Sequence, residues 1–227
     1  DNTIVYYASK FKLDVNKTLE IAHKYTNNYT NEKFTKYNII GPDSVIKDQG
    51  KFNSFEAGAV YFVRDLYRSP DKYGTTEKEI VTSSSVTVAN NRKGYTVYLD
   101  GGMTFTQFLG KIADLYGIDK SIALAIVYEE SGYTSSGLFR NSNNIGGLKG
   151  YHGWNKYPTL EAGTICYILT LKSLANKSNV DFTKNDAIPK LSGIYVYGNP
   201  SKVADSWVGK VTKFRNEINQ KDLFTIK

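Results

Sequence analysis

The sequence predicts a mainly α-helical protein, in which a degenerate N-terminal helical repeat precedes a larger helical lobe and a small β-hairpin lies between them. Three observations lead to this prediction. Apolar residues recur at helical spacing along most of the chain, one central stretch alternates apolar and polar residues, and segments of the first third recur in the second half. The predicted divisions are the repeat at 1–78, a linker with the hairpin at 79–103, and the larger lobe at 104–227.

The N-terminal repeat is expected to be helical. Amphipathic segments predict helices near residues 4–11, 18–25 and 56–67. A polar stretch with proline and glycine follows at 69–79 and is typical of a linker.

The central hairpin is predicted from alternation over residues 81–89 and 95–99, which flank the turn-forming sequence Asn-Asn-Arg-Lys-Gly at 90–94. Asp100 follows the second strand and precedes two glycines, a setting typical of a turn aspartate. The hairpin is therefore expected to connect the two helical parts.

The larger lobe begins at a capping box, a threonine followed three residues later by a glutamine, and apolar residues extend this helix over 104–117. Another helix is expected at about 160–175 and a closing helix over 203–218, with a long polar connection at 176–200. Trp207 belongs to the single apolar face of the closing helix, so we expect it in the core.

An internal repeat supports this organisation. The segment that starts at Phe11 resembles the one that starts at Tyr116, and the segment that starts at Lys51 resembles the one that starts at 156, both at an offset of 105 residues. Two matches at one offset indicate a tandem duplication. At the same offset Tyr25 stands where Glu130 stands in the second copy, so the first copy lacks that acid.

A pair of adjacent glutamates ends the most apolar helix of the chain. Asp119 is placed to cap the start of this helix, residues 122–127 are continuously apolar, and Glu129 and Glu130 precede a serine and a glycine. Partial burial and the negative end of the helix dipole both raise the pKa of a carboxyl group there. An acid still protonated near neutral pH can protonate the leaving oxygen of a glycosidic bond. The alternative interpretation is a frayed helix end with two solvated glutamates.

Small and polar residues follow Glu130 in a specific pattern. Glu-Ser-Gly at 130–132 leads to Ser-Ser at 135–136 and then to Asn-Asn-Ile-Gly-Gly-Leu-Lys at 143–149. This set resembles the motif of glycoside hydrolase family 73, whose members are bacterial endo-β-N-acetylglucosaminidases with a lysozyme-like helical fold. The resemblance spans about residues 105–215 and implies a lysozyme-like catalytic lobe with Glu130 as its general acid.

The resemblance also implies which other residues contact the glycan. Tyr195 or Tyr197 would act beside Glu130, because a tyrosine in this region lines the cleft of family members. The substrate-binding residues would be Asn143, Asn144, Gly147, Lys149 and Trp154. Trp154 stands in a glycine-flanked flap beside the asparagine loop, which suits stacking on a sugar ring.

The second catalytic group stays open. Many family members carry a second acid on a β-hairpin after the asparagine loop, but residues 150–156 contain no carboxylate. Glu161 is expected to be structural, because Glu56 occupies the matching place in the copy without a catalytic acid. The substrate's own acetamido group, a water or a distant acid such as Asp100 could serve instead.

Composition bears on the partners. The net charge is +7, and the lysines are spread without a long basic run, which favours anionic polymers and speaks against nucleic-acid reading. Peptidoglycan glycan strands are the expected partner, with anionic wall polymers or the membrane surface and a membrane protein as further partners. The single cysteine, Cys166, lies in an apolar helix, and the two histidines are isolated, so no metal or cofactor is expected.

The resemblance implies a location in the cell wall, on the extracellular face of a bacterial cell, with an upstream membrane anchor. The competing hypothesis is a non-catalytic cell-wall-binding or partner-binding module, because the first copy has lost the acid. The intact context of Glu130 favours the enzyme.

Overall fold

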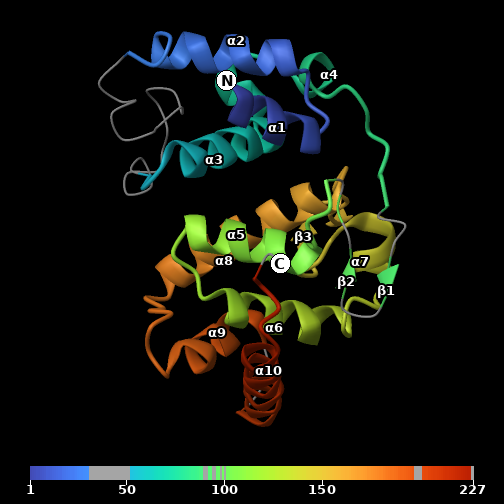
Figure 1. The fold of residues 1–227 in the computed structure, drawn as a ribbon, viewed down its shortest axis with the longest axis vertical. Helices are drawn as coiled ribbons and strands as arrows, with labels where there is room; N and C mark the ends of the chain where they lie inside the picture. The colour runs from blue at the N-terminus through green and yellow to red at the C-terminus, as the bar shows by residue number, and fades with distance from the viewer. Residues whose placement is uncertain are drawn as a thin grey trace. The chain divides into compact units, whose positions relative to one another are not determined.

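The protein forms two compact units, Asp1–Ser85 and Val86–Lys227. Helices dominate both units (Figure 1), and this confirms the prediction of a mainly α-helical fold with a small β-hairpin. The structure, a computed structural model, describes residues 1–30, 52–88, 92–93, 96–97, 99, 101–196 and 201–225.

The first unit packs its helices around an apolar core. Its helices are α1 (Asn2–Lys10), α2 (Val15–Thr26), α3 (Phe55–Arg68), the 3-10 helix η2 (Pro70–Tyr73) and α4 (Glu77–Ile80). α1 packs against both α2 and α3. Ile4, Phe11 and Phe62 are fully buried, so the apolar faces of these helices form the core.

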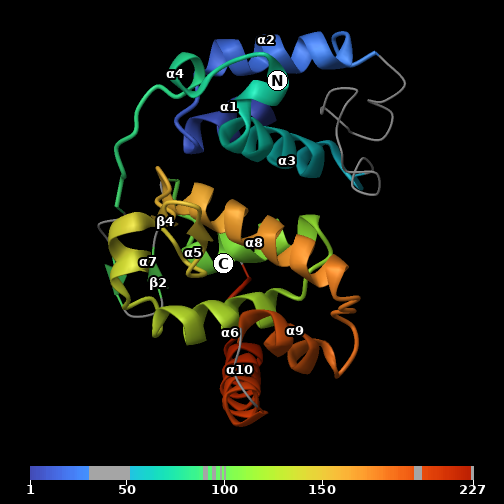
Figure 2. The same ribbon diagram turned by 180° about the vertical axis from the view of Figure 1, so that it is seen from behind.

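The second unit builds its core around two apolar helices, α6 and α8. Its helices are α5 (Phe105–Leu115), α6 (Lys120–Ser131), α7 (Gly137–Ser142), α8 (Leu160–Lys177), α9 (Ala187–Tyr195) and α10 (Ser201–Lys221). α5 packs against α6 and α8, and α10 packs against α6 and α9 (Figure 2). The predicted capping box is confirmed at α5, where Thr104 accepts from the Gln107 N–H at 3.1 Å.

Two of the described helices in each unit were not predicted. In the first unit these are η2 and α4, which replace most of the linker predicted at 69–79. α9 lies in the segment 176–200, where the sequence predicted a long polar connection, and α7 lies in the predicted polar loop. Ile188 and Leu191 bury one side of α9. Pro189 lies in the first turn of α9, where the absence of its N–H costs no helical hydrogen bond. Apolar contacts of Ile188 and Leu191 therefore stabilise α9, a short helix that the composition of its segment did not predict.

The central hairpin is shorter than predicted. β1 (Arg92–Lys93) pairs antiparallel with β2 (Thr96–Val97). The predicted first strand is wrong over residues 81–88, where Val81 makes an isolated bridge to Leu13. A carbonyl of this serine-rich segment accepts from a lysine ammonium rather than from a strand N–H, so its backbone is engaged outside any ladder.

The two units share helix boundaries at the offset that relates the sequence repeats. α2 runs from residue 15 to 26 and α6 from 120 to 131, while α3 begins at 55 and α8 at 160. Asp14 and Asp119 cap α2 and α6 alike, each accepting the backbone N–H three residues later, at 2.8 and 3.0 Å.

The turn that follows each of these helices is also the same. Gly132, Tyr133 and Thr134 have φ values of 54, 57 and 70°, and residues 27–29 have 48, 54 and 67°. Three successive left-handed residues are rare. Their recurrence at one offset supports a duplication independently of the sequence match, with Tyr25 at the place of Glu130.

Candidate active site

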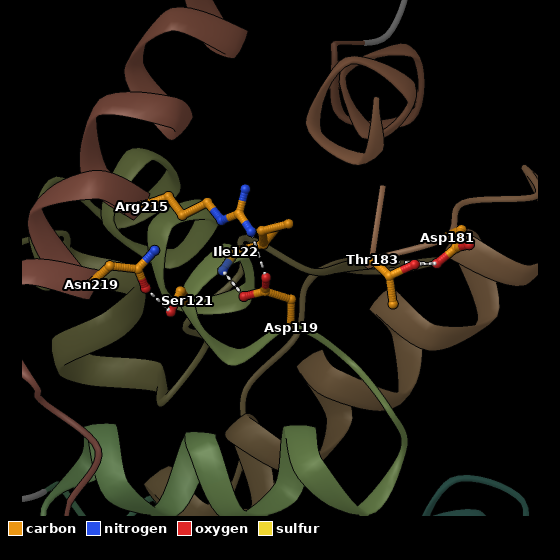
Figure 3. Close-up of polar contacts among 7 residues, drawn as sticks. All are labelled: Asp119, Ser121, Ile122, Asp181, Thr183, Arg215 and Asn219. Atoms are coloured by element: carbon orange, nitrogen blue, oxygen red, sulfur yellow. Dashed lines mark hydrogen bonds and ion pairs between the residues drawn. The ribbon is translucent and has the colours of Figure 1, made fainter. Parts of the chain in front are cut away.

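The helix that carries the two glutamates is fixed at its start by α10. Arg215 pairs with Asp119 at 2.9 Å, and Ser121 donates to the Asn219 side chain at 2.6 Å. Figure 3 shows both α10 side chains reaching the first turn of α6. The residues from 122 to 127 are all fully buried, so α6 is a rigid core element and positions its last turn firmly.

The end of α6 is shaped by Ser131 and Gly132. The Ser131 hydroxyl donates to the Val127 carbonyl and accepts from the Thr134 N–H, at 2.9 Å for the second contact. Gly132 then takes the left-handed C-cap conformation. These contacts stop the helix one residue after Glu130 and make the glutamate-serine-glycine sequence a defined turn rather than a frayed end.

Glu130 combines accessibility with a perturbed carboxyl group. Its side chain is exposed, yet surrounding protein desolvates the carboxyl and raises its pKa, which the charge of Glu129 raises further. The Trp207 indole N–H donates to Oε1 of Glu130 at 3.0 Å and works in the opposite direction. The group is thus reachable by a solute, and its proton is retained to a higher pH than in an ordinary glutamate.

Glu129 lies in a different environment. Its carboxylate forms an ion pair with Lys210 of α10 at 2.9 Å, whereas Glu130 accepts the indole N–H of Trp207 from the same helix. Adjacent helical residues point about 100° apart. The two carboxyl groups therefore have different partners, and the raised pKa falls on Glu130, the residue that the sequence analysis selected.

Tyr195 and Tyr167 complete the surroundings of Glu130. The Tyr195 ring stacks on Trp207 at 5.6 Å between centroids and 17° between planes. Its buried hydroxyl has no hydrogen-bond partner of good geometry, although it lies close to the Tyr167 hydroxyl, which donates to the Ala123 carbonyl at 2.8 Å. Burial, followed by the charge of Glu130, raises the pKa of Tyr195, so this hydroxyl stays protonated and can donate.

Asn143 and Asn144 lie inside the protein, with 0 and 1% of their surfaces exposed. Asn143 donates to the carbonyls of Thr87 and Tyr157, at 3.0 and 3.1 Å. Asn144 bridges the Leu148 backbone, accepting its N–H and donating to its carbonyl, both at 2.8 Å. This burial corrects the expectation that the two amides contact substrate directly, because they act on the loop that carries them.

The flap after this loop is a second short hairpin, which the sequence analysis did not assign as strands. β3 (Lys149–Gly150) pairs with β4 (Gly153–Trp154), and Lys149 lies opposite Trp154. The Lys149 ammonium lies 5.5 Å from the Trp154 ring centre, and 53% of Trp154 is exposed. The hairpin thus presents an aromatic face and a cation to solvent, which fits sugar stacking.

Two glycines allow close approach around this loop. Gly147 has a φ of 61° and lies beside the Trp154 ring. A Cβ at Gly146 would overlap the ring of Tyr167, so the loop lies directly on the tyrosine that neighbours Glu130. Gly147 therefore acts through backbone conformation.

Four further residues were singled out from the sequence. Tyr197 and Asp100 lie outside the described residues. Glu161 is buried in the first turn of α8, and Cys166 is buried in the same helix. Within the part of the chain that the structure describes, no group of three or more His, Cys, Asp or Glu side chains could hold a metal ion.

The structure also identifies Trp207, which the sequence placed in the core only. The residue is 6% exposed, as the apolar face of α10 predicted. That its N–H meets Glu130 depends on how α10 crosses α6. No helix among the described residues has the length and apolarity needed to cross a membrane.

Comparison of the chain with models of protein families, with curated proteins and with solved structures found no match.

Proposed function

We propose that the protein is a peptidoglycan hydrolase, an endo-β-N-acetylglucosaminidase that cleaves the β-1,4 bond between N-acetylglucosamine and N-acetylmuramic acid. The observation that carries this proposal is the accessible carboxyl group of Glu130, whose pKa is raised by burial. Such a group keeps its proton to a higher pH than an ordinary glutamate and can give it to a glycosidic oxygen. The motif at 130–149 supports the choice of bond.

In the proposed reaction Glu130 gives its proton to the oxygen that leaves the anomeric carbon. The carboxylate that forms accepts the Trp207 N–H, which stabilises its new charge. Tyr195 stays neutral, but its hydroxyl is buried, so we assign it to supporting Trp207 through the ring stack rather than to contact with the sugar. Glu130 then takes a proton from water, as general base, when the sugar is hydrolysed.

The proposed reaction also needs a nucleophile that attacks the anomeric carbon. Glu129 is held in its ion pair with Lys210, and Glu161 is buried at the start of α8. We therefore favour the substrate's own acetamido oxygen, which attacks the anomeric carbon as the leaving oxygen is protonated. A water and Asp100 are the alternatives that the sequence analysis left open.

Purified cell walls test the proposal. The protein should release new reducing ends, and borohydride reduction should convert these ends to N-acetylglucosaminitol. A product with reduced N-acetylmuramic acid would identify a muramidase instead. Binding to walls without new reducing ends would reject the enzyme and favour the cell-wall-binding module.

A further inference from the structure

We propose that Trp207 is a positioning residue that determines which oxygen of Glu130 carries the transferable proton. This inference rests on the proposed function and extends it. The sequence analysis assigned Trp207 to the core of α10, and the structure adds a polar contact of its indole N–H with Glu130 at 3.0 Å.

The indole has little freedom to move. It is 6% exposed, and the Tyr195 ring stacks on it with an interplanar angle of 17°. Its helix is tied to α6 by Arg215 and Asn219, which bond to the first turn of α6. α10 thus holds the indole against the last turn of the same helix that it fixes at the start.

The chemistry follows from the indole being a donor only. A neutral carboxyl group has one carbonyl oxygen and one hydroxyl oxygen, and an N–H donor faces the carbonyl oxygen. The contact at Oε1 therefore leaves the proton of Glu130 on Oε2, from which it can be given to the substrate. When the proton leaves, Oε1 keeps its hydrogen bond, which becomes charge-assisted and stronger. Trp207 thus favours the product side of the proton transfer.

Other groups also face Glu130 and act on its pKa. On α6 the charge of Glu129 raises the pKa of Glu130, and Lys210 of α10 pairs with Glu129. From α9 and α8 come the neutral hydroxyls of Tyr195 and Tyr167, whose own pKa values are raised. The direction of a shift on changing Trp207 separates two causes: the lost N–H raises the pKa of Glu130, whereas water admitted beside a smaller ring lowers it.

The first test is Trp207→Phe, which removes the N–H but keeps an aromatic ring. Losing a hydrogen bond to a charged group should lower kcat roughly 10–100-fold. Because this bond lowers the pKa of Glu130, its loss should move the basic limb of the kcat/KM profile to higher pH. Val211→Ala is the control: it removes buried volume from α10 and should lower stability without moving that limb. An unmoved limb in Trp207→Phe overturns the inference.

A second test needs no hydrolysis. The chain has two tryptophans, so Trp154→Phe leaves Trp207 as the only one. Its fluorescence should change with pH as Glu130 titrates, and adding Glu130→Gln should abolish the change. A flat titration overturns the inference even if the protein cuts walls. The fluorescence could also titrate with Glu130 while the wild-type protein releases no reducing ends. That result rejects the proposed function and the positioning role, but it keeps the contact between Trp207 and Glu130.

Discussion

We expect Glu130→Gln to remove most wall hydrolysis and to leave the fold intact. Glutamine has the same shape, and its oxygen can still accept the Trp207 N–H that now meets Oε1 at 3.0 Å. The amide cannot supply a proton to a leaving oxygen. Losing a general acid lowers turnover roughly 10²–10⁴-fold, which corresponds to about 3–5 kcal/mol of transition-state stabilisation.

The matched control is Glu129→Gln, one residue earlier in the same turn. It removes an ion pair with a largely exposed lysine, Lys210, a contact worth about 0–1 kcal/mol of stability. Turnover at the optimum should stay within a few-fold of the wild type. The charge of Glu129 raises the pKa of Glu130, so the basic limb of the activity profile should move to lower pH in this variant.

The raised pKa of Glu130 also predicts how the stability of the wild type compares with that of Glu130→Gln as pH changes. The folded protein holds the Glu130 proton to a higher pH than the unfolded chain, because burial raises the pKa of this group. Below the ordinary glutamate pKa both states are protonated, and Glu130→Gln should match the wild type in stability. As pH rises through the ordinary pKa toward the raised folded pKa, the wild type should become the less stable of the two.

The assay is the initial rate of reducing-end release from one wall preparation, with thermal unfolding followed across the same pH range. A larger loss of activity in Glu129→Gln than in Glu130→Gln would show that the acid was assigned to the wrong glutamate. A Glu130→Gln variant that stays less stable than the wild type at neutral pH would contradict the desolvation of Glu130.

Three further variants test the surroundings of the acid. Asn144→Ala should destabilise the fold by about 2 kcal/mol in denaturant unfolding, because it leaves Leu148 backbone groups without partners; a smaller loss than in a surface control would contradict this. Gly146→Ala should cost about 1–3 kcal/mol, since its Cβ would overlap Tyr167, and an unchanged melting temperature would show that the loop can yield. Trp154→Ala should leave stability nearly unchanged, because half of the side chain is exposed, but should weaken binding to glycan fragments in calorimetry; equal affinity would remove Trp154 from the site.

Local chemistry made much of the fold predictable. Helix starts at Asp119 and at Thr104 depend on side chains that bond to backbone groups three residues away, and such contacts are set by sequence alone. The apolar run at 122–127 required a buried helix, and the structure buries all of it. The offset of the repeats also came from sequence, and the shared turns after α2 and α6 agree with it.

Burial by distant elements made other features unpredictable. The amides of Asn143 and Asn144 looked like substrate contacts, because a polar loop residue does not reveal which carbonyls will surround it. α9 is held by a few apolar contacts, and the central hairpin by a register that weak alternation does not fix.

The sequence alone thus determined that Glu130 ends an apolar helix before a serine and a glycine, because helix capping and hydrophobic periodicity act within a few residues. Only the tertiary structure decided the chemistry of that carboxyl group. Its partner Trp207 lies 77 residues later in the chain, and Tyr195 belongs to α9, a helix that the sequence did not predict. The desolvation and hydrogen bonding of Glu130 depend on how α9 and α10 pack around the end of α6. No local sequence pattern predicts that packing.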